Sequence, residues 1–332
     1  MKKAILSVAA LLAVGVTSAS AADLPAKVYT KAPPVVAFDP WDIAFGSAIM
    51  SDYVFRGVTQ SNHKPSVNAY FEPRYNVTKD LQLYVGTSFS SISFPNRAAA
   101  EVDIYGGIRP TFGAFAFDFG VFGYLYPGGT CQFGGTGVDN TGRFWGSDCA
   151  ANAIFNGNVM KKDASFYEGY AKVMWTVNDM FAFGANEYYS PSFLNTGAWG
   201  NYASVTGKFT APGTLFGSSG VGMYISGEYG HQWFGTSDSF YGVPASPFGI
   251  KYADYNTWNI GVGFTYKVFT LDLRYSDTDL SKANCNAFTS DYTATPSGSF
   301  SPINPTGVGS KWCGSTFIAK LSADLTLMSN IK

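Results

Sequence analysis

Twelve stretches of alternating apolar and polar residues follow a short apolar leader in this chain, and the connections between them alternate between short and long. Alternation with a period of two places successive side chains on opposite faces of a β-strand. The stretches are 41–50, 66–75, 81–90, 100–109, 114–126, 166–177, 181–190, 201–210, 221–231, 255–266, 269–276 and 316–327. We therefore expect an all-β chain of about twelve antiparallel strands, with ten or fourteen as the neighbouring counts.

The lengths of the connections decide between a soluble sandwich and a membrane barrel, which the alternation alone does not. The odd-numbered connections run about 15, 9, 39, 10, 23 and 39 residues, and those between them about 5, 4, 3, 10 and 2, as expected of a barrel with short periplasmic turns and long extracellular loops. The two longest loops have room to hide a short hairpin. A transmembrane β-barrel with both ends of its sheet on the periplasmic side fits this order, and a Greek-key sandwich does not.

The charged residues of the stretches fall almost entirely on the polar face. A basic side chain facing lipid at the bilayer midplane costs about 2–4 kcal/mol, and the cost falls to about 0–1 kcal/mol near the interface. The one charge on the apolar face, Glu187, lies near a strand end. The polar-face charges, which we expect to line the lumen, are Asp42, Glu72, Arg74, Glu101, Asp103, Arg109, Asp118, Glu168, Lys172, Lys208, Glu228, Asp272, Arg274, Lys320 and Asp324.

The N-terminus has the pattern of an export signal. Lys2 and Lys3 precede an apolar run at 4–16, and Ala19-Ser20-Ala21 forms a small-residue cleavage site. The run is too short for a membrane-spanning helix, which needs about 18 apolar residues. We expect a signal peptide at 1–21, a proline-rich periplasmic tail at 22–40 and the barrel at 41–332.

The composition favours a membrane wall over a soluble surface. Charged residues make up 14% of the chain and aromatic residues 17%, whereas a soluble surface carries about 25–35% charged residues. Removing Lys2 and Lys3 with the signal leaves about 20 basic against 23 acidic residues, which argues against a nucleic-acid partner. The expected partners are outer-membrane lipid and small hydrophilic solutes, in the outer membrane of a Gram-negative bacterium.

The four cysteines fall only in the two longest loops, and in an exported protein an even number predicts disulfides. Of the three connectivities, the most local pairs Cys131 with Cys149 and Cys285 with Cys313. No CxxC motif or histidine lies near them, so we expect no metal site and no cofactor.

The chain has two histidines, His63 in the first loop and His231 at the outer end of a strand. A barrel hydrolase needs a serine, a histidine and an orienting polar group together. Ser61 and Ser226 are present, but no motif points to either. We interpret the histidines as unrelated surface residues and the chain as not an enzyme.

Two segments resemble a known family. The stretch 51–61, with 64–65, is similar to the opening signature of the TorF-type porin family, also met as a domain of unknown function, and 258–262 with 271–279 resembles its closing hairpin. The resemblance implies an outer-membrane barrel and a porin role over residue 41 to the end. Arg56 either reaches into the pore mouth or anchors the first loop to a carboxylate. The signature residues are Ser51, Asp52, Tyr53, Phe55, Arg56 and Gly57.

These observations predict a porin-like channel that passes small hydrophilic solutes or ions passively, with a slight preference for cations. One alternative is a non-conducting barrel whose disulfide-tied loops bind a surface partner or stabilise the envelope. Another is a lipid hydrolase that depends on the two histidines. A homo-oligomer is compatible with each.

Overall fold

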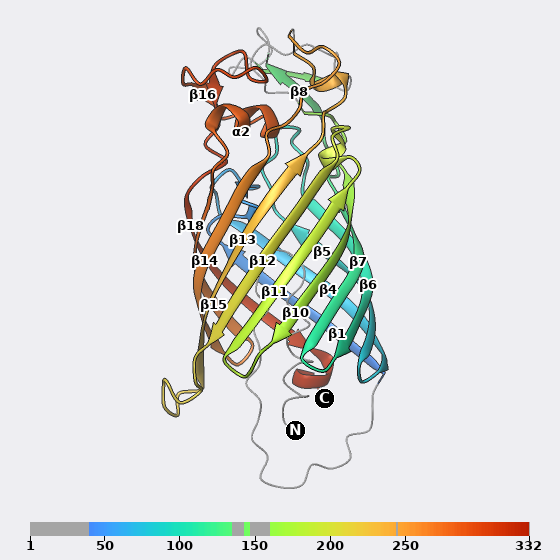
Figure 1. Ribbon diagram of the computed structural model, residues 1–332, viewed down its shortest axis with the longest axis vertical. Coiled ribbons are helices and arrows are strands. Elements are labelled where there is room, and N and C mark those ends of the chain that lie inside the picture. The colour runs from blue at the N-terminus through green and yellow to red at the C-terminus, as the bar shows by residue number, and fades with distance from the viewer. Residues whose placement is uncertain (1–39, 135–142, 147–159, 244, 332) are drawn as a thin grey trace.

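A computed structural model describes residues 40–134, 143–146, 160–243 and 245–331, and its twelve long strands close into one antiparallel barrel (Figure 1). Around the wall the order is β1-β18-β15-β14-β13-β12-β11-β10-β7-β6-β5-β4. β1 and β18 close the ring, with Ala44 opposite Thr326 and Met50 opposite Lys320. The strands are β1 (Trp41–Met50), β4 (Ser66–Thr78), β5 (Leu81–Ser90), β6 (Glu101–Phe112), β7 (Phe115–Leu125), β10 (Phe166–Thr176), β11 (Phe181–Ser190), β12 (Gly200–Thr210), β13 (Val221–Phe234), β14 (Tyr255–Tyr266), β15 (Phe269–Thr278) and β18 (Thr316–Thr326).

The prediction of a twelve-stranded antiparallel barrel is confirmed, but several strand ends are corrected. β6 runs on to Phe112 rather than 109, β13 to Phe234 rather than 231, and β15 to Thr278 rather than 276. Backbone ladders continue past the point where the apolar alternation stops, because hydrogen bonding between strands does not require lipid on one face.

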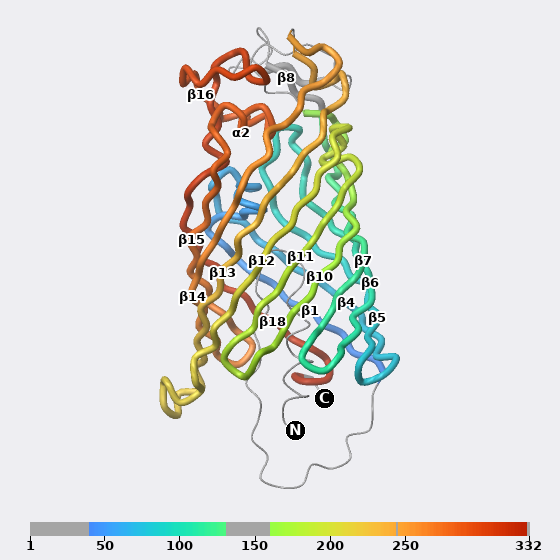
Figure 2. The backbone as a smooth tube through the Cα atoms, in the orientation of Figure 1, coloured from blue at the N-terminus to red at the C-terminus, as the bar shows by residue number. Residues whose placement is uncertain are grey.

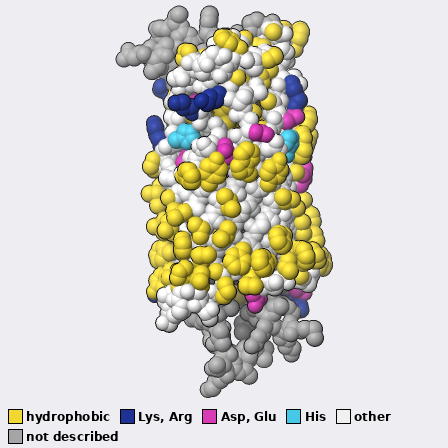
Figure 3. Space-filling model, turned by 60° about the vertical axis from the view of Figure 1, so that its left-hand side comes forward, with side chains coloured by type: hydrophobic (Ala, Val, Ile, Leu, Met, Phe, Trp, Pro, Cys, Tyr) yellow, Lys and Arg dark blue, Asp and Glu magenta, His cyan; other side chains and the backbone are white. Residues whose placement is uncertain are grey.

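On the face shown in Figure 3, apolar side chains gather over the middle of the wall, and charged groups lie mostly above and below them. Val85, Ile104 and Val205 are 59–62% exposed on the outer surface of the wall. Glu187 also faces outward, as its place on the apolar face predicts, and it accepts a hydrogen bond of 2.5 Å from Asn201 Nδ2. A closed barrel with an apolar outer band satisfies every backbone group while facing lipid, so this is a transmembrane β-barrel.

Tyrosines fill much of the inner face, and several lie against a glycine directly opposite on the next strand. Tyr70 faces Gly46, Tyr105 faces Gly86, Tyr84 faces Gly107, Tyr170 faces Gly120 and Tyr224 faces Gly263. A Cβ atom at Gly263 would stand 2.0 Å from Tyr224 Cζ, so the tyrosine ring occupies the space that a side chain at residue 263 would fill. Glycine is therefore required at these positions for the close approach of a ring.

We expect Gly263→Ala to destabilise the barrel by about 1–3 kcal/mol, because the Tyr224 ring has to leave its place and its hydrogen bond to Asp272. Gly169→Ala is the matched control, since a Cβ there meets nothing within 4 Å. Urea unfolding in lipid vesicles measures the free energy of unfolding of both variants. Equal stabilities would show that the tyrosine moves freely in the lumen.

The connections are short turns at one end of the barrel and longer loops at the other, with β8, α2 and β16 grouped at the loop end (Figures 1 and 2). The long loops contain short elements of their own, and room for a hidden hairpin in the two longest was expected. They contain β2 (Val54–Phe55), β3 (Val58–Thr59), β8 (Cys131–Gly134), β9 (Arg143–Gly146), η1 (Phe193–Asn195), η2 (Ser239–Tyr241), α2 (Lys282–Thr289), β16 (Thr295–Pro296) and β17 (Val308–Gly309). A last turn, η3 (Leu327–Ile331), follows β18.

A disulfide ties the last loop to the barrel. It joins Cys285 of α2 to Cys313, which lies just before β18, with a Cα–Cα distance of 6.0 Å. Ser281 caps α2 by accepting from the backbone N–H of Asn284. The other predicted pair, Cys131 with Cys149, lies outside the described side chains, as do the signal peptide and all but the last residue of the tail.

Candidate functional site

The first loop does not stand outside the barrel but folds inward as a hairpin that crosses the bore. We call residues 52–61, with β2 and β3, the bore hairpin. It starts from β1, and its tip at Arg56 and Gly57 reaches β10, β13 and β14, which lie five, four and three strands away from β1 around the ring. Both tip residues have positive φ, 48° and 76°, and a Cβ at Gly57 would stand 2.6 Å from Thr257 Oγ1. Only glycine fits a turn held this close to the wall.

Arg56 fixes the tip to the far wall. Its two terminal nitrogens donate to the two carboxylate oxygens of Glu168 at 2.9 and 2.7 Å, and Nη1 also donates to Gln232 Oε1 at 3.2 Å. The guanidinium lies 4.8 Å from the ring of Tyr188 and 4.4 Å from that of Tyr202. The side chains of Arg56 and Glu168 are 6% and 0% exposed, so this is a buried, bidentate ion pair. Both interpretations of Arg56 hold together, because it reaches into the bore and is anchored there to a carboxylate.

The base of the bore hairpin is held by Asp52. One carboxylate oxygen accepts from Thr59 Oγ1 at 2.5 Å and from Ser61 Oγ at 3.0 Å, and the other lies 2.7 Å from His63 Nδ1. The second nitrogen of His63 lies 2.8 Å from the carbonyl oxygen of Lys311. The first loop is thereby tied to the last.

The hydrogen bond to Asp52 raises the pKa of His63 above its ordinary value, against the effect of burial, and the Lys311 carbonyl and the charge of Asp291 act in the same direction. A raised pKa means that protonation stabilises the folded loop. That stabilisation is complete below about pH 6.5 and is lost as the pH rises through the raised pKa.

We therefore expect amides of the loop at 51–65 to exchange faster with solvent at pH 9 than at pH 5.5, after correction for intrinsic rates. Hydrogen exchange with mass spectrometry measures this. His63→Gln should show the same corrected rates at both values. An equal pH response in the variant would assign the effect to another group.

Four charged side chains form a buried network lower on the inner wall, among the short-turn halves of β4, β6 and β7. Glu72 accepts from Arg74 Nε at 2.6 Å and from Arg109 Nη1 and Nη2 at 2.8 and 3.2 Å. Arg109 Nε also donates to Asp118 at 3.3 Å, and its guanidinium lies 3.5 Å from the Tyr84 ring. All four residues are buried, so the bore is filled by side chains at this level.

The predicted lumen residues of the remaining strands also face inward. Arg274 donates to Asp272 from Nε and Nη2, each at 3.0 Å, and Lys320 lies directly opposite Asp272 in the register of β15 and β18. Glu228 accepts from Tyr202 and Asp324 from Tyr70. Lys172 lies 4.5 Å from the ring of its neighbour Tyr170. Their role as pore-lining residues stays a prediction.

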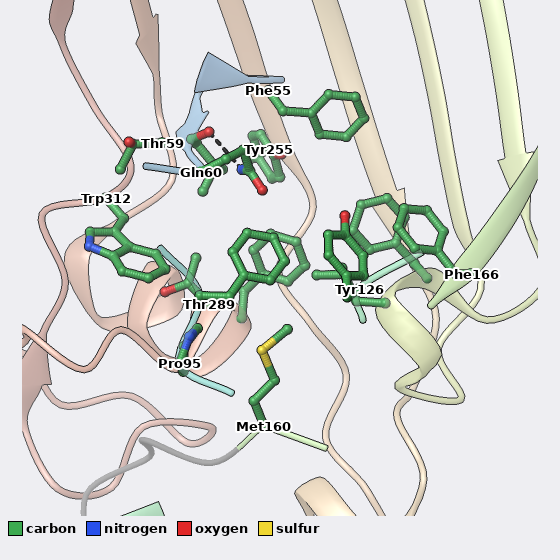
Figure 4. A pocket seen from close by; sticks show the side chains of 15 residues that line it. Phe55, Thr59, Gln60, Pro95, Tyr126, Met160, Phe166, Tyr255, Thr289 and Trp312 are labelled. Atoms are coloured by element: carbon green, nitrogen blue, oxygen red, sulfur yellow. Dashed lines mark hydrogen bonds between the residues drawn. The ribbon is translucent and has the colours of Figure 1, made fainter. Parts of the chain in front are cut away.

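An aromatic chamber lies against the bore hairpin at the loop end of the barrel (Figure 4). The chamber leaves about 40 Å³ open to the centres of water molecules, enough for a few waters at most. Its polar side chains are engaged elsewhere, since Gln60 donates to Val58 O and Thr289 to Cys285 O. Its lining includes Phe55, Tyr126, Phe166, Tyr255, Phe288 and Trp312.

The two histidines are not brought together. His231 Nδ1 lies 2.7 Å from Asn256 Oδ1 on the outer wall. Ser61 Oγ contacts Asp52 and donates to the carbonyl of Lys64, while both nitrogens of His63 are engaged by Asp52 and Lys311. Neither histidine is therefore placed to take a proton from Ser61, as a nucleophile would require.

Sequence reasoning missed the side chains that receive the bore hairpin. Gln232, Tyr188, Tyr202 and Tyr255 carry no charge, and none stands in a motif. Tyr255 donates to the backbone carbonyl of Arg56 at 3.0 Å. Their placement on the polar face of their strands was the available signal, but nothing in the sequence links that face to residue 56.

Part of the chain matches the model of a described protein family. Residues 36–144 match the model of Gcw_chp, a bacterial protein of unknown function. This is about a third of the chain, and the TorF-type assignment stays a prediction. No curated protein matches the sequence.

Solved structures of outer-membrane proteins resemble the barrel at low identity. OmpT of Vibrio cholerae is 11% identical, with 89% of this chain and 100% of that chain covered and a TM-score of 0.34. A FadL homologue of Pseudomonas aeruginosa is 10% identical over 86% and 89%, with a TM-score of 0.40. The KdgM porin in complex with disordered oligogalacturonate is 6% identical over 85% and 98%, with a TM-score of 0.37. These TM-scores are too low to carry an argument about what this barrel does.

Proposed function

We propose that this chain is a channel of the Gram-negative outer membrane that passes small hydrophilic solutes or ions passively, and that the bore hairpin is its latch. The observation that carries the proposal is the Arg56–Glu168 pair, which fastens a segment of the first loop across the bore to the opposite wall. A barrel wall needs no such crossing for its own hydrogen bonds. In this proposal the hairpin is a two-state element, closed when its tip is bound to Glu168 and its neighbours on the far wall, and open when those contacts are broken.

The inner wall supports hydrophilic cargo. It carries acids and bases together with tyrosine hydroxyls, from Glu72 in the middle of β4 to Glu168 near the loop end of β10. Once the hairpin leaves the bore, the groups that hold its tip, such as Glu168 and Tyr202, face water. A lumen of mixed charge lowers the barrier for hydrated ions and small polar solutes.

The test is a planar-bilayer recording of the refolded mature protein, with and without reductant. We expect infrequent ohmic openings from the oxidised protein. We expect more after reduction, because the Cys285–Cys313 bond holds the loop in which Lys311 contacts His63. A folded, heat-modifiable barrel that stays silent under both conditions, and also in Arg56→Ala, would contradict a channel.

A second function has its own supporting observation, which is the extent to which the bore is filled. Arg109, Glu168 and Gln232 are all less than 2% exposed. A non-conducting barrel that displays its tied loops to a surface partner would show the same filling. The silent result above is the outcome that would favour it.

A further inference from the structure

Two buried acids on the inner wall have no basic partner. Glu101 begins β6, and Asp103 follows two residues later on the same face; they are 2% and 0% exposed. Elsewhere on the inner wall, four buried acids lie beside arginines. No ion pair in the described part of the chain includes Glu101 or Asp103. Those four are Glu72, Asp118, Glu168 and Asp272.

In the described part of the chain, the side-chain donors to the two carboxylates are all hydroxyl groups. Tyr53 and Tyr126 donate to Glu101 at 2.5 and 2.8 Å, and Ser88 donates to one oxygen of Asp103 at 2.5 Å. The other oxygen, Asp103 Oδ1, is buried and has no hydrogen-bond partner. From the two flanking strands, Ser88 and Tyr124 stand directly opposite Asp103, and Ser90 stands opposite Glu101. The cluster is thus rich in oxygen and poor in positive charge.

Burying two unpaired carboxylates is costly unless their charge is balanced. We propose that Glu101 and Asp103 bind a divalent cation of the hard, oxygen-preferring class represented by Ca²⁺. The charge of such an ion equals that of the two carboxylates, and Asp103 Oδ1 is the free acceptor it would occupy. Serine and tyrosine oxygens and water complete an oxygen-only set, which suits Ca²⁺ and not the metals that prefer nitrogen or sulfur.

The number of acidic side chains at the site determines its affinity for the cation. In the described residues no group of three or more histidine, cysteine or acidic side chains could hold a metal, so the ion depends on two carboxylates and neutral oxygens. Sites of few charges in extracellular modules bind Ca²⁺ with dissociation constants of about 10⁻⁴–10⁻³ M. The site lies at the loop end of β6, and Tyr53 of the bore hairpin covers it.

Terbium luminescence tests this site without reference to conduction. Tb³⁺ takes Ca²⁺ sites, and the phenols of Tyr53 and Tyr126 at the site would sensitise its emission. We expect saturable emission from the refolded mature protein, displaced by millimolar Ca²⁺. Asp103→Asn keeps the side-chain shape and should weaken Tb³⁺ binding at least tenfold, while Glu187→Gln on the outer wall should leave it unchanged.

A second measurement does not depend on any variant. Ca²⁺ should raise the thermal midpoint of the wild-type protein above its value in choline chloride of equal ionic strength. Unchanged Tb³⁺ binding in a folded Asp103→Asn barrel would overturn the proposal, as would a thermal midpoint that Ca²⁺ does not change. Protonation of the two acids would then explain how they are buried without a basic partner. Neither result depends on whether the barrel conducts.

Discussion

Replacement of Arg56 by alanine is expected to turn a mostly closed barrel into a mostly open one. The variant removes two hydrogen bonds to Glu168, one to Gln232 and the stacking on Tyr188 and Tyr202. It leaves the buried carboxylate of Glu168 without a cation, and with Tyr124 OH as its remaining donor among the described residues, for as long as the hairpin stays in the bore. Truncating one member of a buried, hydrogen-bonded charge pair costs about 2–5 kcal/mol.

That cost falls on the closed state, because Glu168 becomes hydrated when the hairpin leaves. A loss of about 2 kcal/mol corresponds to a shift of more than tenfold in the ratio of closed to open barrels. We expect the open probability in single-channel recordings to rise by at least that factor, until it saturates.

Two variants in the same loop act as controls. Arg56→Lys keeps the charge but loses the bidentate geometry and most of the stacking, so it should open to an intermediate degree. Lys64→Ala removes an exposed basic residue of the same loop and should leave the open probability unchanged. An effect of equal size in Lys64→Ala would mean that loop charge, and not the pair with Glu168, controls opening.

Replacement of Glu72 by alanine is expected to give the largest loss of stability in the barrel, about 3–5 kcal/mol. The carboxylate accepts three hydrogen bonds from Arg74 and Arg109, so its removal takes away the carboxylate that Arg74 binds and leaves Arg109 with Asp118 and the amide oxygen of Gln82. Both guanidiniums are buried, and their charge cannot be removed by deprotonation.

The matched control is Lys79→Ala in the short turn that follows β4. Lys79 lies 3.7 Å from Asp80 and its side chain is 74% exposed, so this pair should contribute about 0–1 kcal/mol. Urea unfolding in lipid vesicles compares the two variants. A cost below about 1 kcal/mol for Glu72→Ala would mean that water already solvates the network and that this level of the bore is open.

The barrel could be predicted from the sequence because its determinants are local and repeated. Alternation such as Leu83, Val85 and Phe89 against Tyr84, Gly86 and Ser88 gives each strand two faces, and the loop lengths give the order of the turns. The same parity placed Glu101, Glu168 and Asp272 on the inner face. Strand ends were less predictable, because ladders such as that of β13 continue past the apolar pattern.

The bore hairpin could not be predicted, because its contacts depend on the closed ring. Arg56 and Glu168 are 112 residues apart in the chain, and they meet only because β1 and β10 face each other across a closed ring. The sequence signalled a special loop through its family-like signature and left two roles open for Arg56. The filling of the bore could not be predicted for a similar reason. The sequence places Tyr84 and Tyr170 on the polar faces of their strands, but it does not show that the closed ring brings them together.

The central claim is that the bore hairpin closes a channel, and removing the hairpin tests it most directly. Residues 54–59 would be replaced by a short glycine-serine link, and the refolded, heat-modifiable barrel recorded in a planar bilayer under a salt gradient. We predict steady ohmic steps with a cation preference that falls when Glu168→Gln is added, because Glu168 then faces an open bore. Silence from that folded barrel would contradict the account and leave a non-conducting barrel in its place.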